Sequence, residues 1–148
     1  ANVVNADGIK WRPEKPADAL LLDAPCSATG TIRRHPDIPR RRKPKDIEAT
    51  TNLQQNLLRA AVDMVKPGGT IVFATCSLEP EEGSNQITTL LDSDPRVALD
   101  PLNLTDWPEL DELSPPAVTP DGVVRTLPCH WSERGGMDGF FVARLIRN

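Results

Sequence analysis

The sequence predicts an α/β fold built on a mostly parallel sheet that ends in a late antiparallel strand. Two continuous apolar runs, residues 19–22 and 70–74, have the length and composition of strands covered on both faces. An amphipathic stretch lies between them. Strand, helix, strand order is typical of a parallel sheet whose crossovers are right-handed, so we expect helices on its faces.

The first half of the chain is expected to contain three regular elements. Residues 1–6 form a short β-like stretch that ends at Asp7, and residues 19–22 form the first buried strand, which ends at Asp23. After a loop over residues 26–45, Asp46 is placed to cap a helix that runs to about Lys66, and the Pro-Gly-Gly at 67–69 ends it. Apolar residues recur at every fourth position of this helix and predict its buried stripe: Leu53, Leu57, Ala61 and Val65, with Leu58 and Val62 beside them.

The second half begins with the strand at 70–74, which ends at Cys76 and Ser77. Pro80 then opens another helix, with acidic residues in its first turn. The stretch from 92 to 122 is rich in proline and acids, with one short strand at 97–99. Residues 123–127 and 139–146 are expected to be late strands around a polar loop.

The composition is typical of a soluble globular protein, and the length favours one domain. The 148 residues are 39% hydrophobic and 26% charged, and no apolar run approaches the roughly 20 residues of a membrane span. With no signal-peptide pattern at its start, the chain is expected to be cytoplasmic. Its three cysteines are too few and too widely spaced for a disulfide framework or a zinc site, which predicts reduced thiols and no metal.

Charge is distributed unevenly along the chain. The net charge is −4, but residues 1–66 carry 12 basic and 8 acidic side chains (+4), against 5 and 13 in the remainder (−8). A polyanion is therefore expected to meet the first half. The basic residues gather in one loop: Arg33, Arg34, His35, Arg40, Arg41, Arg42, Lys43 and Lys45.

Chemically reactive side chains follow the predicted strands. Asp7 follows the first stretch, Asp23 and Cys26 follow the strand at 19–22, and Cys76 follows the strand at 70–74. Ligands of open parallel sheets bind outside the carboxyl ends of the strands, so these groups are expected to converge there. A pair of thiols with a carboxylate can supply a nucleophile, an acid or base, and charge stabilisation.

The motifs around these residues resemble a known family. LLLDAPCSATGTIRRHPDI spans 20–38, KPGG spans 66–69, ATCSLEPEEG spans 74–83 and DGFFVARL spans 138–145. Together they resemble the bacterial Sun-type ribosomal RNA cytosine-5 methyltransferases. The resemblance covers nearly the whole chain and is weakest between residues 92 and 136. It implies a Rossmann-like S-adenosylmethionine-dependent methyltransferase sheet, of which residues 1–148 are the C-terminal portion.

The same resemblance implies a role for each reactive residue. Cys76 of the TCS motif is expected to attack C6 of cytosine, and Cys26 of the PCS motif to assist release of the product. Asp23 would contact the target cytosine beside the methionine end of S-adenosylmethionine, and Asp7 would bind the cofactor near its adenine. The family's glycine-rich cofactor loop, its ribose-binding acid and its N-terminal RNA-binding domain are expected upstream of Ala1.

The expected partner is ribosomal RNA, specifically the small-subunit 16S rRNA, methylated by a monomeric protein. Six of the basic residues are expected to contact its phosphates: Arg33, Arg34, Arg40, Arg41, Arg42 and Lys43. The alternative is a solvated basic loop.

Other interpretations stay open at this point. Either cysteine could be a packing residue, and Asp7 could cap a turn with Gly8. For the whole chain, the alternatives are a catalytically inactive RNA-binding fragment and a DNA cytosine-5 methyltransferase. In the DNA enzymes the nucleophile lies in the PC motif, which would make Cys26 the attacker, and the TCS motif argues against that assignment.

Two further pairs of residues are interpreted as structural. Cys129 and His130 lie in a proline-rich stretch without partners at metal-ligand spacing. Phe140 and Phe141 are expected to belong to a core strand and not to a platform for stacking bases.

Overall fold

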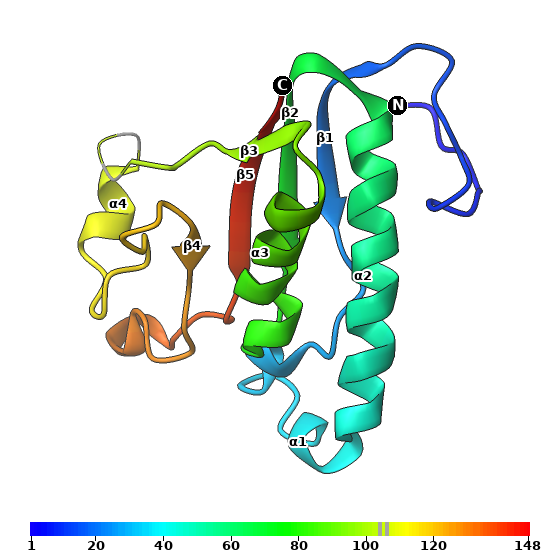
Figure 1. Ribbon diagram of the computed structural model, residues 1–148. Helices are drawn as coiled ribbons and strands as arrows, with labels where there is room; N and C mark the ends of the chain where they lie inside the picture. The colour runs from blue at the N-terminus through cyan, green and yellow to red at the C-terminus, as the bar shows by residue number, and fades with distance from the viewer. Residues whose placement is uncertain (104, 106) are drawn as a thin grey trace.

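A five-stranded sheet with two helices packed on one face organises the chain (Figure 1). The computed structural model describes residues 1–103, 105 and 107–148, without the side chain of Asp111. The strands are β1 (Ala17–Asp23), β2 (Val65–Thr75), β3 (Val97–Leu99), β4 (Val124–Arg125) and β5 (Phe141–Arg147). The helices are α1 (Ile38–Arg41), α2 (Pro44–Met64), α3 (Ser84–Ser93) and α4 (Pro108–Asp111).

The strands lie in the order β1-β2-β5-β3, with β4 also paired to β5. β1 and β2 are parallel neighbours, as predicted, with Leu20 opposite Ile71. The prediction of a mostly parallel sheet is wrong, because β2, β3 and β4 all pair with β5 in the antiparallel sense. β5 is the predicted late antiparallel strand. The first residue of β5, Phe141, lies opposite Thr75, the last residue of β2. Because β5 begins at the edge of the sheet where β2 ends, it runs antiparallel to β2.

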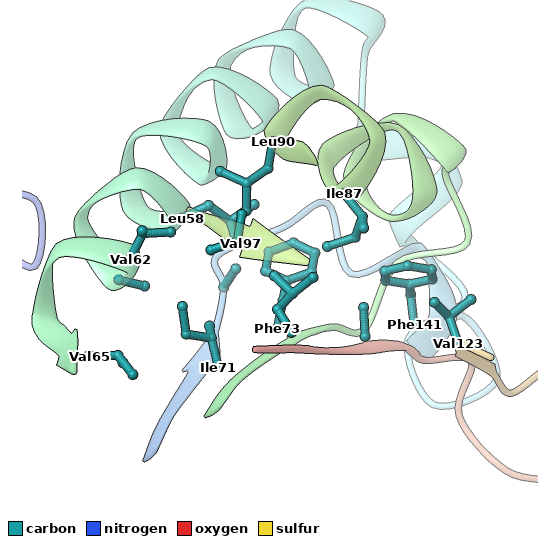
Figure 2. Packing of buried hydrophobic residues seen from close by; sticks show 14 residues of the cluster. Leu58, Val62, Val65, Ile71, Phe73, Ile87, Leu90, Val97, Val123 and Phe141 are labelled. Carbon is teal, nitrogen blue, oxygen red and sulfur yellow. The ribbon is translucent and has the colours of Figure 1, made fainter. Parts of the chain in front are cut away.

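Helix α2 covers β1 and β2 with a stripe that differs from the predicted one. Leu53 is 38% exposed, whereas Gln54 and Leu58 are fully or almost fully buried. The buried face of α2 therefore runs through Gln54, Leu58, Ala61 and Val62, one residue later at its start than predicted. Figure 2 shows Leu58 and Val62 of α2 facing the sheet residues Ile71 and Phe73.

The core lies between the helices and this face of the sheet. Leu90 and Ile87 of α3 complete the hydrophobic cluster (Figure 2). The rings of Phe73 and Phe141 make an edge-to-face contact with their centroids 6.2 Å apart. Full burial of such a side chain contributes about 1.5–3 kcal/mol. Phe141 is 1% exposed, which confirms it as a core strand residue, while its neighbour Phe140 is 36% exposed.

The end of α2 also departs from the prediction. The helix stops at Met64, and Val65 is already extended, so the Pro-Gly-Gly at 67–69 lies inside β2 and does not end the helix. Val65 is fully buried and pairs with Ala17, and a register shift between Ala17 and Ala19 accommodates the extra residues. A β-branched residue with a strand partner favours the extended state.

The N-terminal stretch is not a strand. Residues 1–5 have no regular structure, and Val3 and Val4 are 94% and 59% exposed. The chain turns at Asp7, whose carbonyl accepts the amide hydrogens of Lys10 and Trp11. Without a hydrogen-bonded neighbour or buried side chains, these residues lack both contributions that stabilise a strand.

The remaining predicted elements are present with adjusted bounds. The helix expected at Pro80 begins with a 3₁₀ turn over Pro80–Glu82 and continues as α3. The strand at 97–99 is confirmed as β3, and the late strands become β4 and β5. No helix among the described residues is long and apolar enough to cross a membrane.

Candidate active site at the carboxyl ends of β1 and β2

Two thiols meet where the parallel strands end. Asp23 is the last residue of β1, Cys26 follows three residues later, and Cys76 comes directly after β2. The Sγ atoms of Cys26 and Cys76 are 3.5 Å apart, and both side chains are half-buried. The sequence-based expectation that these residues lie together therefore agrees with the structure.

Backbone hydrogen bonds join the loops that carry the two cysteines. Gly30 donates its amide hydrogen to the carbonyl of Cys76 at 2.9 Å and accepts one from Gly139 at 2.8 Å. A Cβ atom on Gly30 would lie 1.9 Å from the carbonyl oxygen of Gly139, so only glycine allows this approach. Gly30 and Gly139 thus fix the PCS, TCS and DGFF segments to one another.

A buried carboxylate anchors the PCS loop. Glu82 is completely buried, and its two oxygens accept the amide hydrogen of Ser27 at 2.9 and 3.0 Å. The hydroxyls of Ser27 and Thr50 also donate to this carboxylate. Several donors of this kind replace the lost hydration of a buried anion. Glu82 therefore holds Ser27, and with it the backbone beside Cys26.

Helix α2 supplies the second support for this loop. Gln54 is completely buried and donates its side-chain amide to the carbonyl of Pro25 at 2.8 Å. Thr50 lies one turn earlier and reaches Glu82. Sequence reasoning missed these three residues, although polar side chains at the start of the buried stripe, four positions apart, were a visible signal.

The two thiols have opposite proton affinities. The hydrogen bond donated by Cys26 lowers the pKa of Cys76 from its ordinary value of 9.0 to about 7, against the effects of burial and of the charges of Asp23 and Asp138. The same contact raises the pKa of Cys26, and its burial adds to the effect. When the pair loses one proton, the thiolate is therefore on Cys76 and the remaining proton is on Cys26.

The charges of two carboxylates, Asp23 and Asp138, act on Cys76 and raise its pKa. Asp23 is exposed, and Asp138 is held by the guanidinium of Arg34, which donates to both of its oxygens. That hydrogen bonding lowers the pKa of Asp138. Among the described residues, Asp23 has no basic partner and remains open toward a ligand.

The predicted RNA-contacting residues separate into three groups. Arg33 and Arg34 pair with Asp138, and Arg41 pairs with Asp37 at 3.1 Å. Arg42 donates from Nε to the carbonyl of Ser27 at 2.9 Å. Arg40, in helix α1, and Lys43, directly before helix α2, are exposed. Exposed ion pairs are worth about 0–1 kcal/mol, so these cations remain available to phosphates.

Asp7 lies apart from the thiols. Its side chain accepts the amide hydrogen of Ile9 at 3.0 Å, which is the turn-capping contact that the sequence left open. The adjacent Gly8 lies against Leu57 in the middle of α2, and Arg12 pairs with Asp63 near its end. The structure therefore does not bring Asp7 to the edge where Asp23 and the cysteines meet.

The Cys129-His130 pair has no partners of the kind a metal needs. Cys129 is exposed, while His130 is 1% exposed and accepts the amide hydrogen of Leu127 at Nδ1. The described residues contain no group of three or more His, Cys, Asp or Glu side chains placed to hold a metal ion.

Comparison with known proteins matches nearly the whole chain. Residues 1–146 match the family described as 16S rRNA methyltransferase RsmB/F. The ribosomal RNA small subunit methyltransferase B of Salmonella paratyphi B is 43% identical over 150 residues, which cover 99% of this chain. The chain spans 31% of the length of that relative.

Solved structures from Pyrococcus horikoshii share the fold. NSun6, solved with SFG, superposes with a TM-score of 0.73 at 26% identity, over 99% of this chain and 34% of its own. A methyltransferase homologue superposes with a TM-score of 0.63 at 32% identity, over 90% of this chain and 40% of its own.

Proposed function

The chain belongs to the 16S rRNA methyltransferase RsmB/F family, and we propose that the protein carrying it methylates C5 of a cytosine in small-subunit ribosomal RNA. The proposed methyl donor is S-adenosylmethionine, and residues 1–148 are the C-terminal part of the catalytic domain. The observation that carries this proposal is the pair of thiols 3.5 Å apart at the ends of two parallel strands. The relative from Salmonella, named as a small-subunit rRNA methyltransferase, supports the choice of RNA.

The first step assigned to the chain is attack by Cys76. C5 of neutral cytosine is a poor nucleophile, and a thiolate that bonds to C6 shifts the C5–C6 π electrons so that C5 becomes nucleophilic. Cys76 suits this role because its pKa is lowered to about 7, so about half of it is thiolate at pH 7. Cys26 supports the thiolate by donating a hydrogen bond to it.

Asp23 is proposed to hold the base. Its exposed side chain lies at the end of β1, where Asp23 pairs with Ala74, two residues before Cys76. In its protonated form it would donate a hydrogen bond to N3 of the cytosine, where negative charge develops as the thiolate adds to C6. Bound S-adenosylmethionine supplies the electrophilic methyl group. The residues present fit part of this cofactor, because Asp23 is exposed, has no basic partner among the described residues, and in its ionised form suits the amino group at the methionine end.

Cys26 is proposed to act in product release. After C5 carries the methyl group, its proton must leave, the C5–H electrons restore the C5–C6 double bond, and the C6–S bond breaks with its pair returning to Cys76. A base from solvent would take the C5 proton, and protonated Cys26 would donate its hydrogen bond to the Cys76 sulfur as the C6–S bond breaks. The raised pKa of Cys26 keeps it protonated, which suits a donor that stabilises the departing thiolate.

The test is trapping of the covalent intermediate with the complete gene product. Cys76→Ala should abolish both methylation of 16S rRNA and any covalent adduct on a denaturing gel. Cys26→Ala should leave attack and methyl transfer possible but slow release, so that protein accumulates as a covalent complex with RNA. Cys129→Ala is the matched control and should behave as the wild type, because Cys129 is exposed and distant in sequence from both motifs.

The reverse pattern decides against the assignment. An adduct in Cys76→Ala and none in Cys26→Ala would exchange the roles and support the DNA-enzyme alternative. Intact methylation in both variants would make the cysteines structural. Tight binding of 16S rRNA without any methylation by the wild type would support the inactive RNA-binding alternative.

A further inference from the structure

A groove of about 360 Å³ adjoins the loops that carry the cysteines. Its lining is largely apolar and comes from three segments, the loop after Cys26, the start of α2 and the turn after Cys76: Ile32, Pro39, Pro44, Ile47 and Leu78. Known ligand sites occupy roughly 300–1,000 Å³ and have mostly apolar walls. The groove therefore has the size and surface to take one planar ring with its attached groups.

The groove lies close to the thiols. Leu78 is two residues after Cys76 and Thr29 is three after Cys26, so their Cα atoms lie within roughly 7 and 11 Å of the cysteines. Thr29 Oγ1 accepts the amide hydrogen of Leu78 at 2.9 Å, which joins the two sides of the groove. A ligand here would be a close neighbour of a base bound at Cys76.

Cations lie on one side of the groove. Arg42 and Lys43 belong to its lining, and the Nε hydrogen bond from Arg42 to Ser27 holds that guanidinium in place. Glu79 is the acid among the lining residues, and its charge acts on the half-buried Arg125. Two cations against one partly compensated acid favour an anionic ligand at this side.

An acidic hollow adjoins the groove at Pro44 and Ile47. It has a volume of about 420 Å³, and its lining also includes Glu48 and Glu81. A phosphate is attracted toward Arg42 and repelled from this hollow. The charge pattern thus gives the groove a direction, with the phosphate at the cationic side and the ring on the apolar lining.

We propose that this groove binds an unpaired nucleotide of the RNA strand that flanks the target cytosine. Its base would lie against Ile47 and the neighbouring apolar side chains, and its phosphate would face Arg42 and Lys43. RNA that is recognised by sequence presents unpaired bases, whose flat faces pack on apolar or aromatic side chains. The proposal rests on the function proposed above and adds a flanking-base site to it.

The experiment compares intact and abasic RNA with the complete gene product. The methylated cytosine of 16S rRNA is mapped first, and a short transcript around it is then made with one abasic nucleotide at each of the positions flanking it. For the wild type, one abasic position should lower kcat/KM about fivefold or more, the effect expected when one stacked base is removed. In Ile47→Ala the ratio between intact and abasic RNA at that position should fall toward one.

Leu53→Ala is the matched control, because Leu53 is a similar, partly exposed residue of α2 outside the groove. It should keep the wild-type ratio. If no abasic position matters to the wild type, or if Ile47→Ala retains the full ratio, the groove does not hold a base and serves another occupant such as a peptide. Failure of the function itself gives a different result, since the wild type would then form no 5-methylcytosine in intact 16S rRNA.

Discussion

Replacing Cys26 should change the acidity of its neighbour as well as the fate of the adduct. In Cys26→Ala the thiol that donates to Cys76 at 3.5 Å is gone, while burial and the charges of Asp23 and Asp138 remain. Since that hydrogen bond is the largest influence lowering the pKa of Cys76, we expect the pKa to return from about 7 to 9.0 or above.

The size of the effect follows from the thiolate fraction. At pH 7 a thiol with a pKa of about 7 is half ionised, and one with a pKa of 9.0 is ionised to about 1%. The more basic thiolate is intrinsically more reactive, by roughly eightfold over two units at a Brønsted coefficient of about 0.45. Compared with the wild type, the alkylation rate of Cys76 in Cys26→Ala should therefore be about sixfold lower at pH 7 and about sevenfold higher at pH 10. The two pH–rate profiles should cross at about pH 8.

The assay is the pH dependence of iodoacetamide labelling, followed for each cysteine-containing peptide by mass spectrometry. Cys129 is exposed and provides an internal reference that should label alike in both proteins. Cys129→Ala should leave the Cys76 profile unchanged. Superimposable profiles for wild type and Cys26→Ala would refute the reasoning, because they would mean that Cys26 does not stabilise the Cys76 thiolate.

Three further results are expected. Glu82→Ala removes the acceptor of the buried Ser27 amide and should lower the free energy of unfolding, measured by chemical denaturation, by about 3 kcal/mol or more. The control Glu81→Ala, at the exposed neighbouring position, should change it by less than about 0.5 kcal/mol. Equally small effects of the two substitutions would contradict the anchoring role of Glu82. The 148-residue chain should bind S-adenosylmethionine weakly or not at all, because its sequence contains no glycine-rich strand-to-helix loop. A micromolar Kd in calorimetric titration, which corresponds to a binding free energy of about −8 kcal/mol, would overturn this prediction. Replacing Arg40, Arg41 and Arg42 with Ala should reduce the slope of log K for RNA binding against log salt concentration by about one unit for each phosphate that is no longer neutralised. An unchanged slope would mean that the cluster is a solvated loop without phosphate contacts.

The fold was predictable where local pattern and tertiary structure agree. Strands β1 and β2 come from continuous apolar runs, and their parallel pairing follows from the helix between them. The prediction that both faces of β1 are covered is wrong, because the helices pack on one face of the sheet and Leu21 is 70% exposed on the other. The late antiparallel strand was expected, but the position of β5 between β2 and β3, which makes most of the pairing antiparallel, was not predictable from periodicity. A strand has the same alternation in either direction, and only the point at which the chain re-enters the sheet decides it.

Helix α2 shows that hydrophobic periodicity predicts the helix but not the exact position of its buried face. Leucines at 53 and 57 predicted one face, but the structure buries Gln54 and leaves Leu53 38% exposed. Hydrophobicity alone misplaces such a stripe, because Gln54 is buried for its hydrogen bond to Pro25 and not for its transfer free energy.

The sequence by itself predicted which residues would carry the proposed chemistry: two cysteines, each after an apolar strand, with Asp23 three residues before the first. It also determined that these strand ends lie together, because parallel neighbours end at one edge of a sheet. Only the tertiary structure decided that the sulfurs lie 3.5 Å apart, that Cys76 is the more acidic, and that Glu82 is buried under Ser27. These are contacts between residues about fifty positions apart, and their hydrogen-bond geometry exists only once the chain has folded.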